Sequence, residues 1–119
     1  MMKMAEARRM ALSLPEATEE DHFGIPSFRV KKKIFATVPG DKTIRIMLGP
    51  EETSAATSTN PRTFEELWWG KQLAGITVHL AQADKRHVAD LLFEAWRRKA
   101  PKTLVKAFQP TRTPKRARD

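Results

Sequence analysis

The sequence contains no cysteine among its 119 residues, so disulfides and thiolate metal sites are excluded. No apolar run approaches the roughly 20 residues that a membrane-spanning helix requires. The N-terminal residues include Lys3, Glu6, Arg8 and Arg9, and this density of charge differs from the apolar block of a signal peptide. These absences predict a cytoplasmic protein that is not associated with a membrane.

The chain also lacks common enzyme motifs: a cysteine nucleophile, a glycine-rich phosphate loop and a pair of histidines at metal-binding spacing. Its three histidines, His22, His79 and His87, are far apart in the sequence. His22 follows the acidic residues 19–21 and could act as a base or a metal ligand, although a loop histidine is more often an ordinary polar residue. We therefore predict no catalytic residues, no metal and no cofactor.

The formal net charge of +8 is concentrated at the C-terminal end. Residues 1–96 hold 13 Lys and Arg against 13 Asp and Glu, whereas residues 97–119 hold nine basic residues and one acidic residue. This asymmetry indicates a basic arm on a neutral domain. We predict a single domain at residues 1–108 and a basic tail at residues 109–119, which has almost no apolar residues and is expected to be disordered.

Apolar spacing predicts a helix and then an antiparallel meander in the first half of the chain. The helix is expected over about residues 2–13, with Pro15 ending it and residues 16–21 forming a solvated acidic connector. Alternating apolar residues then predict three strands, the first leading up to a bend at Lys31 and Lys32. The second and third strands are expected at residues 33–38 and 43–48.

Period-two alternation assigns the residues of this meander to two faces. The face expected to pack on helices carries Phe28, Val30, Ile34, Ala36, Val38, Ile44, Ile46 and Leu48. The face expected to point outward carries Arg29, Lys31, Lys33, Phe35, Thr37, Arg45 and Met47.

The second half of the chain predicts two more strands and the best amphipathic helix. A short helix begins at Pro50, and a second short helical piece is expected over residues 62–67. Strands are predicted at residues 67–71 and 75–80, and a long helix at residues 84–100. The expected fold is α+β, with two layers. An antiparallel sheet of about five strands is covered by helices in the order α-β-β-β-α-β-β-α.

Three tryptophans lie in or beside these elements. Trp96 falls on the apolar stripe of the long helix, so we predict that it is buried against the sheet. Its expected partners are Ile34, Ile44 or Ile46. Trp68 and Trp69 are neighbours on a predicted strand and would point to opposite faces, so either one could enter the core or line a pocket.

Five short stretches occur in a recognisable order. They are Leu12-Ser13-Leu14-Pro15-Glu16-Ala17; Gly24, Pro26, Phe28 and Val30 at alternate positions; Lys33-Ile34-Phe35-Ala36; Ile76-Thr77-Val78-His79-Leu80 followed by Asp84; and Ala95-Trp96-Arg97-Arg98-Lys99-Ala100-Pro101. Together they resemble the MmcQ/YjbR family of small bacterial proteins over about residues 8–108. The resemblance implies an antiparallel sheet covered by helices, as in secretion chaperones and frataxin-like proteins, together with a role in DNA binding. It implies no catalytic residues.

Two groups of basic residues are candidates for binding nucleic acid. The outward sheet face presents Arg29, Lys31, Lys33 and Arg45 around Phe35. Its cations could contact phosphates while the ring stacks on a base, unless the face is simply solvated. The tail adds Arg112, Lys115, Arg116 and Arg118. We expect weak, sequence-tolerant binding of DNA or another nucleic acid, because such contacts are mainly electrostatic.

A protein- or peptide-interaction module is the alternative. An outward face with Phe35 and Met47, near a spare tryptophan, would offer a chaperone-like docking surface. We expect a monomer or a weak homodimer. A homodimer formed through the sheet would hide the basic face.

Overall fold

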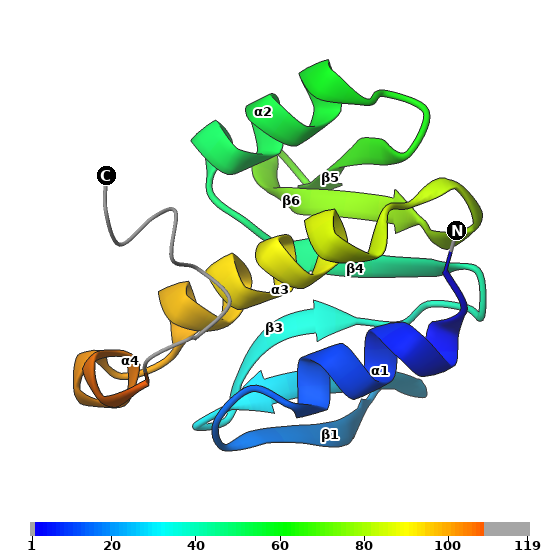
Figure 1. Ribbon diagram of the computed structural model, residues 1–119. Coiled ribbons are helices and arrows are strands. Elements are labelled where there is room, and N and C mark those ends of the chain that lie inside the picture. Colours follow the sequence, from blue (N-terminus) through cyan, green and yellow to red (C-terminus); the bar gives the residue numbers. More distant parts are fainter. Residues whose placement is uncertain (1, 109–119) are drawn as a thin grey trace.

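The computed structural model describes residues 2–108, which form a six-stranded antiparallel sheet with helices packed on one face (Figure 1). The strand order is β1-β2-β3-β4-β6-β5. In Figure 1, α1 and α3 lie side by side across the sheet, and α2 packs on β5 and β6. The α+β class and the helix-covered antiparallel sheet are confirmed, with one strand more than the five expected. The predicted tail at residues 109–119 lies outside the described residues.

The N-terminal helix α1 spans Met4–Leu12, close to the range that its apolar spacing predicted. The Glu6 carboxylate closes the first turn by accepting a hydrogen bond from the Lys3 backbone N–H at 2.9 Å. Ala7 and Ala11 are fully buried, and α1 packs against α3. The small alanine side chains let the two helices approach closely.

The acidic stretch predicted as a solvated connector is instead the edge strand β1, Ala17–His22. Its backbone pairs with β2 along its whole length, from Ala17 opposite Val30 to His22 opposite Ile25. Carboxylates are poor strand formers in general, which is why the local sequence indicated a loop. On an edge strand, however, they remain in water and discourage pairing with another chain. The four central residues of β1 are accordingly exposed.

The predicted meander is confirmed as β2 (Ile25–Val30), β3 (Lys33–Thr37) and β4 (Thr43–Met47). Lys31 and Lys32 make the predicted bend between the first two strands, with φ values of +50° and +70°. Two successive residues at positive φ match the right-handed twist of a hairpin. The bend therefore directs both lysine side chains to the end of the sheet.

A β-bulge in this meander reverses three of the face assignments, those of Lys33, Ile34 and Phe35, since Lys33 pairs with the core residue Val30. Phe28 lies opposite Ala36 and Arg29 lies opposite Ile34, so Phe35 is an extra residue between two paired positions. Phe35 is fully buried in the main core, whereas Ile34 shares the outer face with Arg29. The prediction of an outward Phe35 ring that stacks on a base is wrong, because a buried ring cannot reach a ligand. Period-two counting assumes an unbroken ladder and cannot detect a bulge.

A short helix and a hairpin follow. The helix α2, Pro50–Thr59, begins at the predicted proline. The strands β5 (Phe64–Trp69) and β6 (Gln72–His79) then pair across a tight turn at residues 70–71. The helical piece predicted at residues 62–67 is wrong, because hydrogen bonding to β6 overrides the weak local preference for helix. Residues 72–74, which were expected to separate the two predicted strands, lie inside β6.

The long helix α3 spans Lys85–Lys99, after a single 3₁₀ turn η1 at Leu80–Gln82. Asp84 caps it by accepting a hydrogen bond from the His87 backbone N–H at 3.1 Å. A last short helix, α4, spans Lys102–Ala107. Within residues 2–108, every helix is too short or too polar to cross a membrane.

Trp96 on α3 is fully buried, as predicted. Ile44 and Ile46 belong to the same core, whereas Ile34 lies on the opposite face of the sheet. The Trp96 indole N–H donates a hydrogen bond to the Pro15 carbonyl oxygen at 2.9 Å. This bond ties α3 to the segment that joins α1 to β1.

Gly75 allows β4 and β6 to pair closely. Its φ is +156°, and an added Cβ would collide with the Ile46 carbonyl oxygen and lie 2.8 Å from the Leu48 nitrogen. Both of these atoms belong to the backbone, so no side-chain rotation can relieve the clash. Only glycine fits this position without moving a strand.

We predict that Trp96→Ala lowers the free energy of unfolding by about 3–5 kcal/mol, because it leaves a large cavity and an unpaired Pro15 carbonyl. Urea unfolding monitored by circular dichroism measures the loss. The control is Trp68→Ala, whose side chain is 51% exposed and whose removal should change stability by no more than about 0.5 kcal/mol. Equal losses in the two variants would contradict the assignment of Trp96 to the core.

We also predict that Gly75→Ala lowers the free energy of unfolding by about 3 kcal/mol or more, because strand β6 must move away from β4. Gly40→Ala is the matched control, since an added Cβ there meets no atom within 4 Å. Calorimetry should show a clear fall in Tm for the first variant and almost none for the second. An unchanged Tm for Gly75→Ala would contradict the close approach of β6 to β4 at this residue.

Candidate functional site

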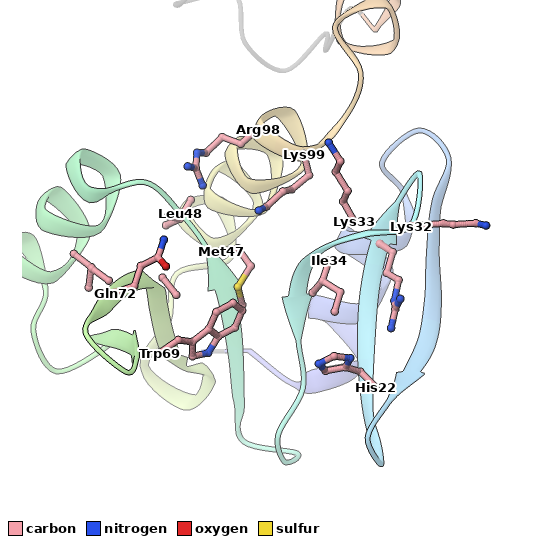
Figure 2. Close-up of a pocket in the computed structure, with 13 residues that line it drawn as sticks. His22, Lys32, Lys33, Ile34, Met47, Leu48, Trp69, Gln72, Arg98 and Lys99 are labelled. Atoms are coloured by element: carbon pink, nitrogen blue, oxygen red, sulfur yellow. The ribbon is translucent and has the colours of Figure 1, made fainter.

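A cleft opens on the outer face of the sheet where β3 and β4 separate (Figure 2). The register between these strands comprises two pairs, Ala36 with Ile46 and Thr37 with Arg45, so the start of β3 diverges from the end of β4. The last turn of α3 and the β5–β6 hairpin supply the other walls. The cavity volume of about 560 Å³ lies within the range of small-ligand sites.

The wall of this cleft is basic. Among the described residues, its charged lining consists of Arg29, Lys32, Lys33, Arg98 and Lys99, with His22 and no carboxylate. In Figure 2, Lys99 points into the cleft toward Met47, Lys33 extends from the facing wall, and Lys32 points away. The cleft is therefore rich in positive charge, and its Arg29 Nε also lies 3.9 Å from the Glu20 carboxylate, which is outside the lining.

The pKa of Lys99 is shifted by its surroundings in the cleft. Burial, together with repulsion from the nearby Arg98 and Lys33 side chains, lowers the pKa of the Lys99 ammonium below its usual value. An anion bound between these cations would stabilise the charged form. The cleft is thus suited to negatively charged ligands.

Apolar side chains form the floor of the cleft. Met47 is only 3% exposed although it lies outside the main core, because it is covered on the outer face of the sheet. Ile34, Leu73 and Trp69 line the same space. Figure 2 shows the Met47 and Trp69 side chains among the residues that line the cleft. A flat apolar group could rest here while the surrounding cations hold an attached anion.

The two adjacent tryptophans differ in their surroundings. A register shift between Leu67 and Trp68 leaves both indoles about half exposed, so neither enters the core. Trp68 donates its indole N–H to the Glu66 carboxylate at 3.0 Å. Trp69 lines the cleft, where the described lining contains no carboxylate. The sequence left open which tryptophan lines a pocket, and the structure assigns that position to Trp69.

The structure brings together two of the predicted sheet-face residues, Arg29 and Lys33, in the cleft. The Arg29 guanidinium is held in place because its Nε donates to the Ser27 hydroxyl at 3.0 Å. Lys31 lies outside the lining and forms an ion pair with Glu16 at 2.6 Å.

Arg45 lies apart from the cleft on the sheet face, between Thr37 and Thr77 on the neighbouring strands. Its Nε is buried and has no hydrogen-bond partner among residues 2–108. The predicted tail residues lie outside the described residues; they are Arg112, Lys115, Arg116 and Arg118.

The basic surface continues from the cleft onto α4. A second depression between the ends of α3 and α4 is lined by Arg97, Arg98, Lys102 and Lys106, along with Ala100 and Val105. Arg98 lines both depressions, so the two are adjacent. Five of the nine basic residues that the sequence assigned to a C-terminal arm therefore belong to the folded domain. The domain is not neutral, because residues 2–108 carry 18 Lys and Arg against 13 Asp and Glu.

The three histidines each have a different neighbour. The His22 ring contacts Phe23 with centroids 4.8 Å apart, and the His87 ring contacts Phe64 at 4.9 Å. His79 Nε2 lies 3.2 Å from the Glu65 carboxylate. Within the described part of the chain, no group of three or more His, Asp or Glu side chains is placed to hold a metal ion.

The YjbR family model matches residues 12–98, which is most of the described domain. The chain belongs to the YjbR family. No curated protein and no solved structure matches it. The family match includes the β2–β3 hairpin, the β5–β6 hairpin and α3 as far as Arg98. Lys99 and α4 lie beyond the matched residues.

Sequence reasoning missed Lys32, Arg98 and Lys99 as site residues. A local signal existed for the last two, since basic residues in the final turn of a helix lie where the helix dipole is negative. Arg98, two positions after the buried Trp96, points away from the core, whereas Lys99, three positions after it, is only partly exposed and points into the cleft. What the sequence did not indicate is that the splayed end of β3 faces them.

We predict that Arg98→Gln raises the pKa of Lys99, because one of the two neighbouring cations that lower it is removed. Lys33→Gln should also raise it, by a smaller amount. An NMR titration that follows the Lys99 Cε and Nζ signals measures both shifts. Lys42→Gln, which removes a cation that does not contribute to the shift, should leave the pKa unchanged. No change in Arg98→Gln would show that the cations are not close enough to interact.

Proposed function

We propose that this YjbR-family protein is a small, cytoplasmic, non-enzymatic protein that binds nucleic acid weakly and with little sequence preference. The observation that carries the proposal is the convergence of Arg29, Lys33, Arg98 and Lys99, from three separate elements, on a lining in which the described residues include no carboxylate. Lysine and arginine are the main protein contacts to phosphate oxygens. The cleft and the α4 depression together form the proposed interface.

The extent of this surface favours a polyanion over a single small anion. The cations of the α4 depression continue from Arg98 to Lys102 and Lys106, with apolar Val105 between them. A ligand with regularly repeated phosphates could contact several of these cations in turn. Each contact would release condensed counterions from the nucleic acid, which is a favourable term at low salt.

The expected lack of sequence preference follows from the kind of side chains involved. Lysine is a flexible point charge and contacts phosphates, whereas base identity is read by fixed donors and acceptors at the base edges. Lys33 and Lys99 project from different walls across an open space. They are suited to holding a backbone and poorly suited to reading bases.

We predict that Lys33→Gln lowers the slope of log affinity against log salt by about 0.9 for duplex DNA if Lys33 neutralises one phosphate. Lys31→Gln is the matched control. It removes the same charge from the neighbouring turn, but Lys31 is already paired with Glu16 and lies outside the cleft lining. Fluorescence anisotropy of a labelled oligonucleotide at several salt concentrations measures both slopes.

The tail is tested in the same assay. Removing residues 110–119 deletes four cations, so full engagement of the tail lowers the slope by up to about 3.6. If this truncation abolishes all binding while the cleft variants bind like the wild type, the folded domain does not bind nucleic acid. Nucleic-acid binding would then be a non-specific electrostatic property of the tail.

A protein- or peptide-interaction module is the second candidate. The observation that favours it is Phe23, whose side chain is 94% exposed at the tip of the β1–β2 hairpin, together with the half-exposed Trp68. Large exposed apolar side chains are often partner sites. The two functions differ in oligomeric state, because a homodimer through the outer sheet face would cover the cleft. Light scattering at several protein concentrations distinguishes a monomer with an open cleft from such a dimer.

A further inference from the structure

We infer that the cleft takes a single-stranded segment of nucleic acid rather than a duplex, with one unpaired base stacked on the indole of Trp69. This inference rests on the proposed nucleic-acid function and specifies its ligand. It replaces the stacking role predicted for Phe35, whose ring is fully buried.

The first argument is the position of Trp69. Its indole is 55% exposed and lines the cleft together with the apolar Met47 and the cations. Every base has an apolar π-face, and every base is joined to a phosphate. A stacked base on Trp69 would therefore place its backbone near Lys99 and Arg98 without any requirement on base identity.

The second argument is the shape of the surface. In a duplex, both faces of each base are covered by neighbouring pairs, so an indole can stack only on a base that is unstacked or at an end. Duplex readers usually insert a helix or a β-ribbon into a groove. The basic residues here line a cavity of about 560 Å³ instead, which can enclose a group the size of a nucleotide. A duplex could contact only its rim.

The third argument is the contrast between the two tryptophans. Trp68 is as exposed as Trp69, but its indole N–H is bonded to the Glu66 carboxylate, which would repel a phosphate. The cations of the cleft lie on the Trp69 side. From the cleft, Arg98 continues the basic surface toward Lys102, so the strand has a path onto α4.

The test compares short oligothymidylate, oligouridylate and a duplex of equal length, using the full chain and fluorescence anisotropy. We expect single strands to bind more tightly than the duplex. Trp69→Ala should weaken single-strand binding by about five- to a hundredfold, leave duplex binding unchanged and leave the salt slope unchanged. Trp69→Phe should restore most of the affinity, and Trp68→Ala should behave like the wild type. Circular dichroism confirms that each variant is folded.

Quenching of tryptophan fluorescence gives an independent readout. A single strand should quench the wild type and Trp68→Ala, but not Trp69→Ala, because only the Trp69 indole stacks on a base. The same dependence on Trp69 with DNA and RNA supports the inference, and a preference for either one identifies the natural strand.

The outcomes separate the inference from the function on which it rests. If single strands and duplex bind equally well and Trp69→Ala changes neither, the inference is wrong and the proposed function stands. Tighter binding of the duplex would also overturn the inference. If the wild-type protein binds none of the three probes at low salt, both the inference and the proposed function are wrong.

Discussion

The burial of Trp96 is the interaction on which the arrangement of the rest depends. Its indole lies in the core and donates to the Pro15 carbonyl at 2.9 Å, which fixes α3 against both the sheet and the α1–β1 connection. Phe108 packs against the same indole, with ring centroids 5.5 Å apart, and so holds the end of α4. The packing of Trp96 sets the position of the last turn of α3, so Arg98 and Lys99 lie at the splayed end of β3. Packing in the core thus decides where the charges gather.

Placing several cations in one cleft destabilises the folded protein, and two features of the fold reduce this loss of free energy. Burial, and after it repulsion from Arg98 and Lys33, lowers the pKa of Lys99, so holding these cations together costs free energy. Two features offset the repulsion: the negative end of the α3 dipole lies beside Arg98 and Lys99, and Arg98 is exposed to water and salt. Elsewhere in the domain, cations are placed beside carboxylates, as in the bidentate bond of Arg8 to Glu19. The described residues that line the cleft include no carboxylate, although Glu20 lies 3.9 Å from Arg29 just outside the lining, and this excess of cations is expected of an anion site.

Local patterns in the sequence were sufficient for most of the fold and insufficient for the site. The apolar stripe of α3, the meander and the bend at Lys31 and Lys32 follow from spacing and turn chemistry, which act over a few residues. The bulge at Phe35 and the edge strand β1 do not, because both depend on what a neighbouring strand offers for pairing. The cleft is even harder to predict from local sequence patterns. It joins the β2–β3 hairpin, the β5–β6 hairpin and the end of α3, three regions that only the completed fold brings together.

The edges and the outer face of the sheet favour different partners. Edge strand β1 exposes Glu19, Glu20 and Asp21, and edge strand β5 exposes Glu65 and Glu66, so extension of the sheet by another chain is opposed at both sides. A symmetric dimer through the outer face would place the same surface on both subunits and bring the basic cleft against its own copy. Such a contact would bury cations without carboxylates to pair them, which is costly in free energy. A partner that carries its own negative charge avoids this cost, and a nucleic-acid strand supplies that charge at every nucleotide.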